Sequence, residues 1–99
     1  MKKLIENLIE ELVRGTSRKL TSINFSIDKR NQDLLRETLQ KELMKPSIKQ
    51  SKTPTQLVNE FLYKKFNQNF DLTPSSFGDK AHELIMEWGI QKTEDFHEH

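Results

Sequence analysis

The sequence predicts a mainly α-helical protein with one short β-strand that pairs with the same strand of a second copy. Apolar residues recur at helical spacing over most of the chain, whereas residues 20–28 alternate between apolar and polar side chains. A single strand leaves its backbone N–H and C=O groups unpaired, so it needs a partner strand. Because no other segment alternates as clearly, we expect that partner to come from a second copy.

The composition is that of a single small domain. The chain has 99 residues, of which 33% are hydrophobic and 31% charged, a balance that favours a small helical protein completed by dimerisation. Cysteine is absent, which argues against a disulfide framework or a thiolate zinc site, and we expect a cytoplasmic protein. No apolar run reaches membrane-spanning length, so we expect no membrane partner.

The net charge of +1 hides an uneven distribution. Residues 14–65 hold twelve Lys and Arg against five Asp and Glu, whereas residues 66–99 hold two against seven. A basic middle followed by an acidic end favours a polyanion such as DNA as the partner of the middle. The alternative is the ordinary variation of a protein surface.

An amphipathic helix is expected over residues 1–14, and Gly15 is a natural residue to end it. Its apolar stripe consists of Leu4, Ile5, Leu8, Ile9, Leu12 and Val13. A short basic connector then leads to the strand, and Asp28 is the expected N-cap of the next helix.

The next helix is expected from Lys29 onward and stops before Pro46, which cannot continue it. Its apolar stripe consists of Leu34, Leu35, Leu39 and Leu43. After a basic loop, Thr53 and Gln56 form a capping box with Pro54 at the first helical position, which predicts a helix up to Phe66.

A last helix is expected to start at Thr73-Pro74 in the same way and to end before Gly89. Its buried stripe consists of Phe77, Ala81, Leu84, Ile85 and Trp88. The chain thus divides into an N-terminal helix over residues 1–15, a strand and two helices over 16–66, and a C-terminal helix with a loose tail over 67–99.

The order of strand, Asp cap, helix, basic loop and capped helix with the run Gln56-Leu57-Val58-Asn59-Glu60-Phe61-Leu62 resembles the ribbon-helix-helix family of Arc, MetJ and CopG type repressors. The resemblance covers about residues 20–66. It implies an obligate homodimer whose paired strands enter the major groove of DNA. The loop of residues 45–52 departs from the family, because it is longer than the usual turn and has no glycine. Because of this longer loop, the resemblance does not determine the angle at which the two helices cross.

The resemblance assigns three groups of residues. The outward face of the strand would read DNA bases through Ser22, Asn24 and Ser26. Phosphates would be bound before the strand and at the start of the second family helix, by Arg14, Arg18, Lys19, Lys49, Lys52, Thr53 and Thr55. The dimer core would contain Ile23, Phe25, Ile27, Leu35, Leu39, Leu57, Val58, Phe61 and Leu62. The alternative for the polar strand face is an exposed surface with no partner.

No enzyme motif is present, so we expect neither catalytic residues nor a cofactor nor a metal. The acidic row Asp79, Glu83 and Glu87 is best explained as a solvated helix face.

The function expected is a sequence-specific transcriptional repressor of a bacterium, plasmid or phage. Two alternatives remain. One is an antitoxin with repressor activity and a C-terminal toxin-binding segment. The other is an all-helical protein-interaction module in which residues 20–27 form a loop and the basic middle binds an acidic protein instead of DNA. The C-terminal helix is available to a protein partner in each case.

Overall fold

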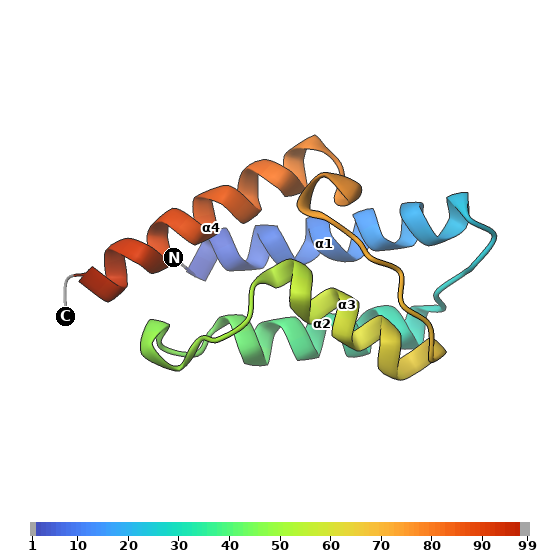
Figure 1. Cartoon of the computed structure of the whole chain (residues 1–99), viewed down its shortest axis with the longest axis horizontal. Helices are drawn as coiled ribbons and strands as arrows, with labels where there is room; N and C mark the ends of the chain where they lie inside the picture. Colours follow the sequence, from blue (N-terminus) through green and yellow to red (C-terminus); the bar gives the residue numbers. More distant parts are fainter. Residues whose placement is uncertain (1, 98–99) are drawn as a thin grey trace.

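The computed structural model describes residues 2–97, which fold into helices alone (Figure 1). They form α1 (Lys2–Ser22), α2 (Lys29–Leu43), η1 (Ser47–Lys49), α3 (Pro54–Phe66), η2 (Pro74–Phe77) and α4 (Asp79–His97), where η marks a short 3-10 helix. No β-strand occurs within the described residues, so the predicted strand and the ribbon-helix-helix-like dimer built on it are wrong.

The long helix α1 lies in the middle of the molecule and packs against α2 on one side and α4 on the other (Figure 1). Helix α3 packs against α2, and η2 packs against both α1 and α4. The molecule measures 44 × 24 × 21 Å, and one continuous hydrophobic core joins residues of all four α-helices.

The predicted end of the first helix at Gly15 is wrong, because α1 continues to Ser22. Gly15 packs against Phe77 of η2, and an ideal Cβ on Gly15 would lie 2.4 Å from the Phe77 carbonyl oxygen. The glycine therefore allows η2 to approach α1 closely. Beyond it, Leu20 is fully buried and holds the last turns of α1 in the core.

The segment predicted as a strand is the end of α1, a turn and an extended linker. Asn24 has a left-handed backbone with φ of 65°, and its N–H donates to the Thr21 carbonyl oxygen over 3.1 Å. The Phe25 N–H donates to the Leu20 carbonyl oxygen over 2.8 Å. These backbone groups are satisfied within the chain, which removes the need for a second strand.

The apolar face expected for the strand is split among three environments. Ile23 is 42% exposed, whereas Ile27 is buried in the core. Phe25 packs edge-on against Phe66 and Phe70, with ring centroids 6.2 and 5.4 Å away. This aromatic cluster closes the end of the molecule at which α1 turns into α2 and α3 ends.

The predicted starts of α2 and α3 are confirmed. Asp28 caps α2, since its Oδ1 accepts a hydrogen bond from the Asn31 N–H over 2.7 Å. Thr53 and Gln56 form the expected capping box, with the Thr53 hydroxyl accepting from the Gln56 N–H and the Gln56 Oε1 accepting from the Thr53 N–H. The expected stop before Pro46 is also confirmed, because α2 ends at Leu43.

The bounds predicted for the last helix are wrong at both ends. Thr73 and Pro74 begin only the short η2, and Gly78, with φ of 104°, separates it from α4. Helix α4 then continues through Gly89. The predicted stripe is nevertheless buried, with Ala81, Leu84, Ile85 and Trp88 on α4 and Phe77, which is 1% exposed, on η2.

The side chain of Asn59 on α3 holds the connector that precedes η2. Its Nδ2 donates to the Leu72 carbonyl oxygen and its Oδ1 accepts from the Leu72 N–H, both over 3.0 Å. Leu72 is thereby fixed in the core, which sets the path of the chain toward α4. Between Lys2 and His97, none of the helices is sufficiently long and apolar to cross a lipid bilayer.

Candidate functional site

The three residues predicted to read DNA bases do not share a strand face. Ser22 is the last residue of α1, and its hydroxyl donates to the Lys19 carbonyl oxygen over 2.7 Å. Asn24 lies in the left-handed turn and Ser26 in the extended linker. Because the segment is helix and turn, it offers no ribbon for the major groove.

The residues predicted to bind phosphate fall into two groups at opposite ends of α2 (Figure 1). One group lies on the C-terminal part of α1 and the other follows α2; they are Arg14, Arg18 and Lys19, and Lys49, Lys52, Thr53 and Thr55. With 15 residues, α2 is about 22 Å long, so the structure does not gather these residues into one site.

Two members of the second group, Lys52 and Thr53, have partners within the chain, whereas Lys49 is exposed. The Lys52 Nζ lies 2.7 Å from Glu60 Oε2, and Thr53 caps α3. The Thr55 hydroxyl is buried without a hydrogen-bond partner. The hydrogen bond from Lys52, together with the nearby Lys64, lowers the pKa of Glu60, which keeps this carboxylate ionised beside the two cations.

The residues predicted for a dimer core lie in the core of a single chain, with the exceptions of Ile23 and Phe25 described above. Those buried in this way are Ile27, Leu35, Leu39, Leu57, Val58, Phe61 and Leu62. Their burial is complete without a second copy, so it supplies no reason for a dimer.

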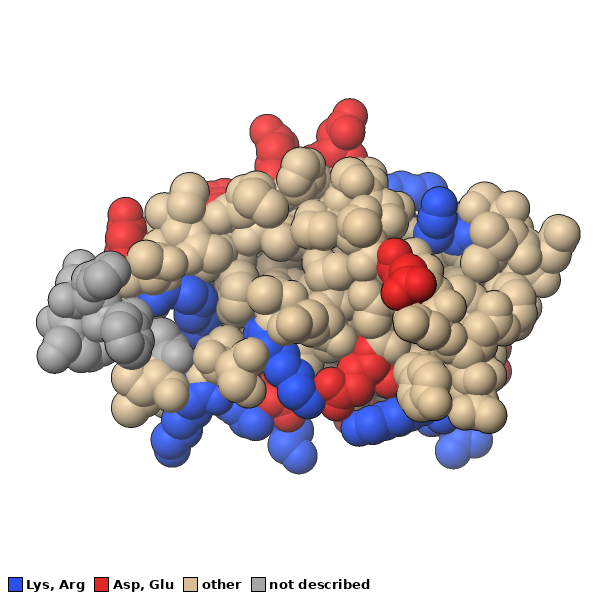
Figure 2. All heavy atoms as spheres, in the orientation of Figure 1, with Lys and Arg blue, Asp and Glu red and all other residues tan. Residues whose placement is uncertain are grey.

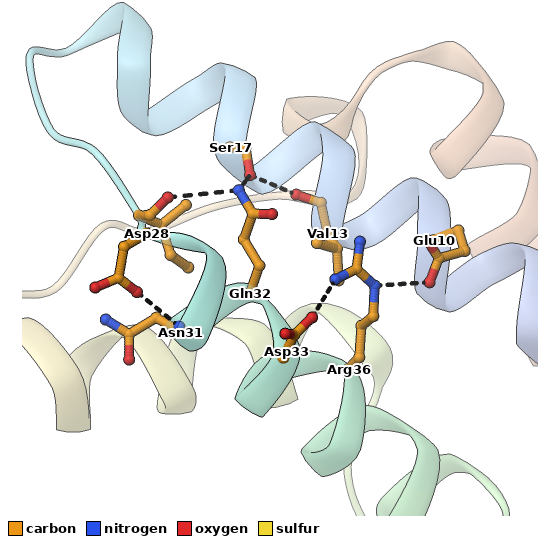
Figure 3. Close-up of polar contacts among 9 residues, drawn as sticks. Glu10, Val13, Ser17, Asp28, Asn31, Gln32, Asp33 and Arg36 are labelled. Carbon is orange, nitrogen blue, oxygen red and sulfur yellow. Dashed lines mark hydrogen bonds and ion pairs between the residues drawn. The ribbon is translucent and has the colours of Figure 1, made fainter.

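A hollow of about 290 Å³ between α1 and α2 gathers Arg14, Arg18 and Arg36. Figure 3 shows that Arg36 reaches across from α2, donating to Glu10 Oε2 over 2.9 Å and to Asp33 Oδ1 over 2.8 Å. The hydrogen bond with Glu10 is the main cause that raises the pKa of Arg36.

The other two arginines of this hollow also have partners. Arg14 forms an ion pair with Glu11 over 3.3 Å, and Arg18 donates to the Phe77 carbonyl oxygen over 3.1 Å. Since each guanidinium is engaged, the hollow joins α1 to α2 and η2, and it is a poor anion site.

A groove of about 560 Å³ runs along one side of α4 and is lined mostly by apolar side chains. Helix α4 supplies most of its wall, while η2 and the start of α3 supply the rest. The lining residues are Thr53, Pro74, Ile85, Met86, Trp88, Gly89, Ile90, Thr93 and Glu94. The Trp88 indole Nε1 is buried in this wall without a hydrogen-bond partner.

Met86 and Ile90 form what we call the apolar ridge of α4. They are 49% and 59% exposed, and their spacing of four residues places them side by side on one helix face. The ridge also borders a second hollow of about 520 Å³, whose polar lining consists of Glu83 and Glu87 together with Lys80 and His82. It therefore separates an apolar groove from an acidic flank.

The charge around the ridge is negative. Helix α4 has five Asp and Glu against two lysines, and one of these, Lys92, donates to the Lys45 carbonyl oxygen over 2.9 Å. Figure 2 shows acidic side chains projecting from the edge where α4 lies, whereas Lys and Arg gather along the opposite edge. None of the ion pairs among the side chains that the structure describes includes Glu83 or Glu87.

The groove and the ridge beside it offer an apolar surface on α4. Among the side chains that the structure describes, no group of three or more His, Cys, Asp and Glu is placed to hold a metal ion. The groove presents apolar side chains with a few hydroxyls at its rim, and methionine adapts well to the shape of a partner surface. Contiguous exposed apolar surface is a common feature of interaction sites.

Met86 and Ile90 are not among the residues that the sequence pattern predicts for a site. The signal that identifies them is their position off the buried stripe of α4: two large apolar residues, four apart, occur where the helix faces water. Comparison with known protein families, curated proteins and solved structures finds no significant match to this chain.

Proposed function

We propose that this chain is an all-helical protein-interaction module that binds another protein along α4. The observation that carries the proposal is the apolar ridge of Met86 and Ile90 beside the groove. The hydroxyl groups at the rim of this groove are bonded within the chain, since Thr53 caps α3 and Thr93 donates to the Gly89 carbonyl oxygen over 2.9 Å. A toxin is one class of partner that such a module could bind.

The free energy that the apolar ridge can contribute to binding is moderate. Fully burying a large apolar side chain contributes about 1.5–3 kcal/mol, so each half-exposed residue of the ridge contributes about 1 kcal/mol on binding. The remaining affinity would come from contacts with the groove wall around Trp88.

Site-specific photo-cross-linking in cells of the source organism tests this proposal. A benzoylphenylalanine at Ile90 is expected to give an adduct with a discrete protein, whereas one at Glu37, exposed on α2, is not. Met86→Asp should abolish the adduct at position 90 without changing the helical circular dichroism. Equal adducts at both positions, or none at position 90, would reject the proposal.

A second candidate is DNA binding that needs no ribbon. It is supported by the excess of Lys and Arg over residues 14–65, many of which line the edge of the molecule opposite α4 (Figure 2). Binding through phosphates alone would be independent of sequence and would weaken steeply with salt. A shift assay with the upstream DNA and an unrelated duplex should then give equal affinities; no shift at low salt removes this candidate.

A further inference from the structure

We infer that the partner segment that fills the α4 groove is a basic amphipathic α-helix, which approaches α4 most closely at Gly89. This inference rests on the proposed function and adds the chemistry of the partner. Three features of the groove support this inference. Its wall has no strand edge, the charge beside it is negative, and the space above Gly89 is open.

The groove favours a helix over an extended peptide. An extended peptide on a protein surface gains much of its affinity by pairing its backbone with a strand edge. The described chain has no strand, and the backbone of α4 is paired within its own helix. A helical partner satisfies its own backbone groups and needs only apolar contacts, which the groove wall supplies.

The charge beside the groove favours a basic partner. Glu83 and Glu87 share the hollow on the far side of the ridge with Met86 and Ile90, and Lys80 is the one lysine in its lining, so carboxylates outnumber ammonium groups there by two to one. Glu94 lines the groove itself. Lysine and arginine have long side chains that could cross the ridge from a helix seated in the groove and reach these carboxylates.

A second copy of this chain, seated α4 against α4, fits less well. Both surfaces would present the acidic row that includes Glu83 and Glu87, and like charges across an interface are unfavourable. The α4 face is therefore complementary to a helix of opposite charge.

The space above Gly89 indicates where the partner comes closest. Glycine weakens the interior of a helix, and Gly89 lies within α4 with no atom within 4 Å of an ideal Cβ. Nothing in this chain therefore requires a glycine at that position. Because Gly89 lines the groove beside Trp88, an absent side chain there lets a second helix approach the α4 backbone.

Trp88 makes this inference measurable, because it is the only tryptophan in the chain and it lines the groove. Three peptides of about 18 residues, a length that spans α4, would share one Leu and Ala stripe and would differ in having Lys, Gln or Glu on the polar face. Titrated against the full chain, the Lys peptide should change Trp88 fluorescence and bind about tenfold more tightly than the Gln peptide. The Glu peptide should bind most weakly.

Charge variants separate this effect from nonspecific attraction. Glu83→Gln with Glu87→Gln should bring the affinity of the Lys peptide to about that of the Gln peptide. The matched control, Glu6→Gln with Glu37→Gln, removes two exposed acids from α1 and α2 and should leave the tenfold preference unchanged. Equal loss in both double variants would overturn the assignment of the acidic flank.

Gly89→Ala tests the close approach. It should raise the melting temperature of the free chain and weaken binding of the Lys and Gln peptides by about tenfold, because the added methyl occupies the space that the partner needs. Unchanged affinity would show that no close contact occurs there.

The outcomes distinguish this inference from the proposed function. Equal binding of the three peptides, combined with a protein adduct at Ile90, rejects the basic helix and leaves the interaction module in place. Absence of both peptide binding and the adduct rejects both. Concentration-dependent self-association in sedimentation, lost in Met86→Asp, would instead assign the groove to a second copy.

Discussion

Gly15 and Gly89 both lie within long helices of this chain, yet their surroundings differ. The Cβ position of Gly15 is occupied by the Phe77 backbone, whereas that of Gly89 is open. The first glycine is required by the fold of this chain, and the second is not. A sequence cannot distinguish these two cases, because the neighbour that decides between them is distant along the chain.

Substituting each glycine by alanine should therefore have opposite effects on stability. Gly15→Ala should lower the free energy of unfolding by about 1–2 kcal/mol, since overpacking outweighs the gain in helix propensity. Gly89→Ala should raise it by about 0.5–1 kcal/mol. Urea denaturation of both variants measures the difference, and a stabilised Gly15→Ala protein would contradict the packing of η2 on α1.

The pKa of Glu60 gives a second test at the scale of single residues. Its hydrogen bond with Lys52 lowers this pKa below the ordinary value of 4.5, so Lys52→Gln should raise it. A depressed pKa contributes stability that is present above the unfolded value and is lost as the pH falls through the folded value.

The difference in stability between wild type and Lys52→Gln should accordingly be present at neutral pH and vanish in acid. NMR titration of the Glu60 carboxyl group measures the pKa directly. Lys65→Gln is the matched control, because Lys65 lies over the Phe61 ring and forms no ion pair with Glu60. An unchanged Glu60 pKa in Lys52→Gln would contradict the ion pair.

At the scale of elements, the positions at which α2 and α3 begin are set by capping side chains that bind backbone N–H groups a few residues away. Asp28→Ala removes the oxygen that accepts from the Asn31 N–H, so it should lower stability by about 1 kcal/mol. Hydrogen exchange at the Asn31 amide should become faster in this variant. Asp33→Ala, which removes only an exposed partner of Arg36, should leave that amide protected. Equal exchange at Asn31 in wild type and Asp28→Ala would contradict the cap.

These two helix starts could be predicted because their signals lie within a few residues. Asp28 and the pair of Thr53 and Gln56 act on neighbouring backbone N–H groups, whatever the rest of the fold. Proline at position 46 stops α2 for an equally local reason.

The ends of α1 and α4 could not be predicted in this way. Alternation over a few residues suggested a strand, but burial of Leu20 and the close approach at Gly15 keep the chain helical up to Ser22, and a turn and a linker follow. Gly89 suggested a helix end, yet the buried stripe through Trp88 carries α4 beyond it. In both cases packing with distant residues decides the local structure.

The candidate site was missed for a related reason. The sequence marks Trp88 and Ile85 as part of a buried stripe, and this is correct. It does not reveal that Pro74 and Thr53 come to lie beside them and turn one side of α4 into a groove. Only the exposed pair of Met86 and Ile90 could have been recognised from the pattern alone.

The whole molecule has a hydrophobic core that is completed within one chain and a surface on which charged and apolar side chains are unevenly distributed. The residues expected to complete a dimer are buried within one chain, and α4 presents an acidic, partly apolar face (Figures 1 and 2). Sizing by light scattering at low micromolar concentration should therefore give the 11.7 kDa mass of one chain. A mass of two chains that survives Met86→Asp would contradict a core complete without a partner.

The most direct test of this account is an NMR measurement on residues 16–28 of the full chain. Cα and Cβ chemical shifts should be helical through Ser22, and nuclear Overhauser contacts should join Phe25 to Phe66 and Phe70 of the same molecule. Extended shifts over residues 21–27, with contacts between the same segment in two differently labelled copies, would contradict the account and restore the paired strand.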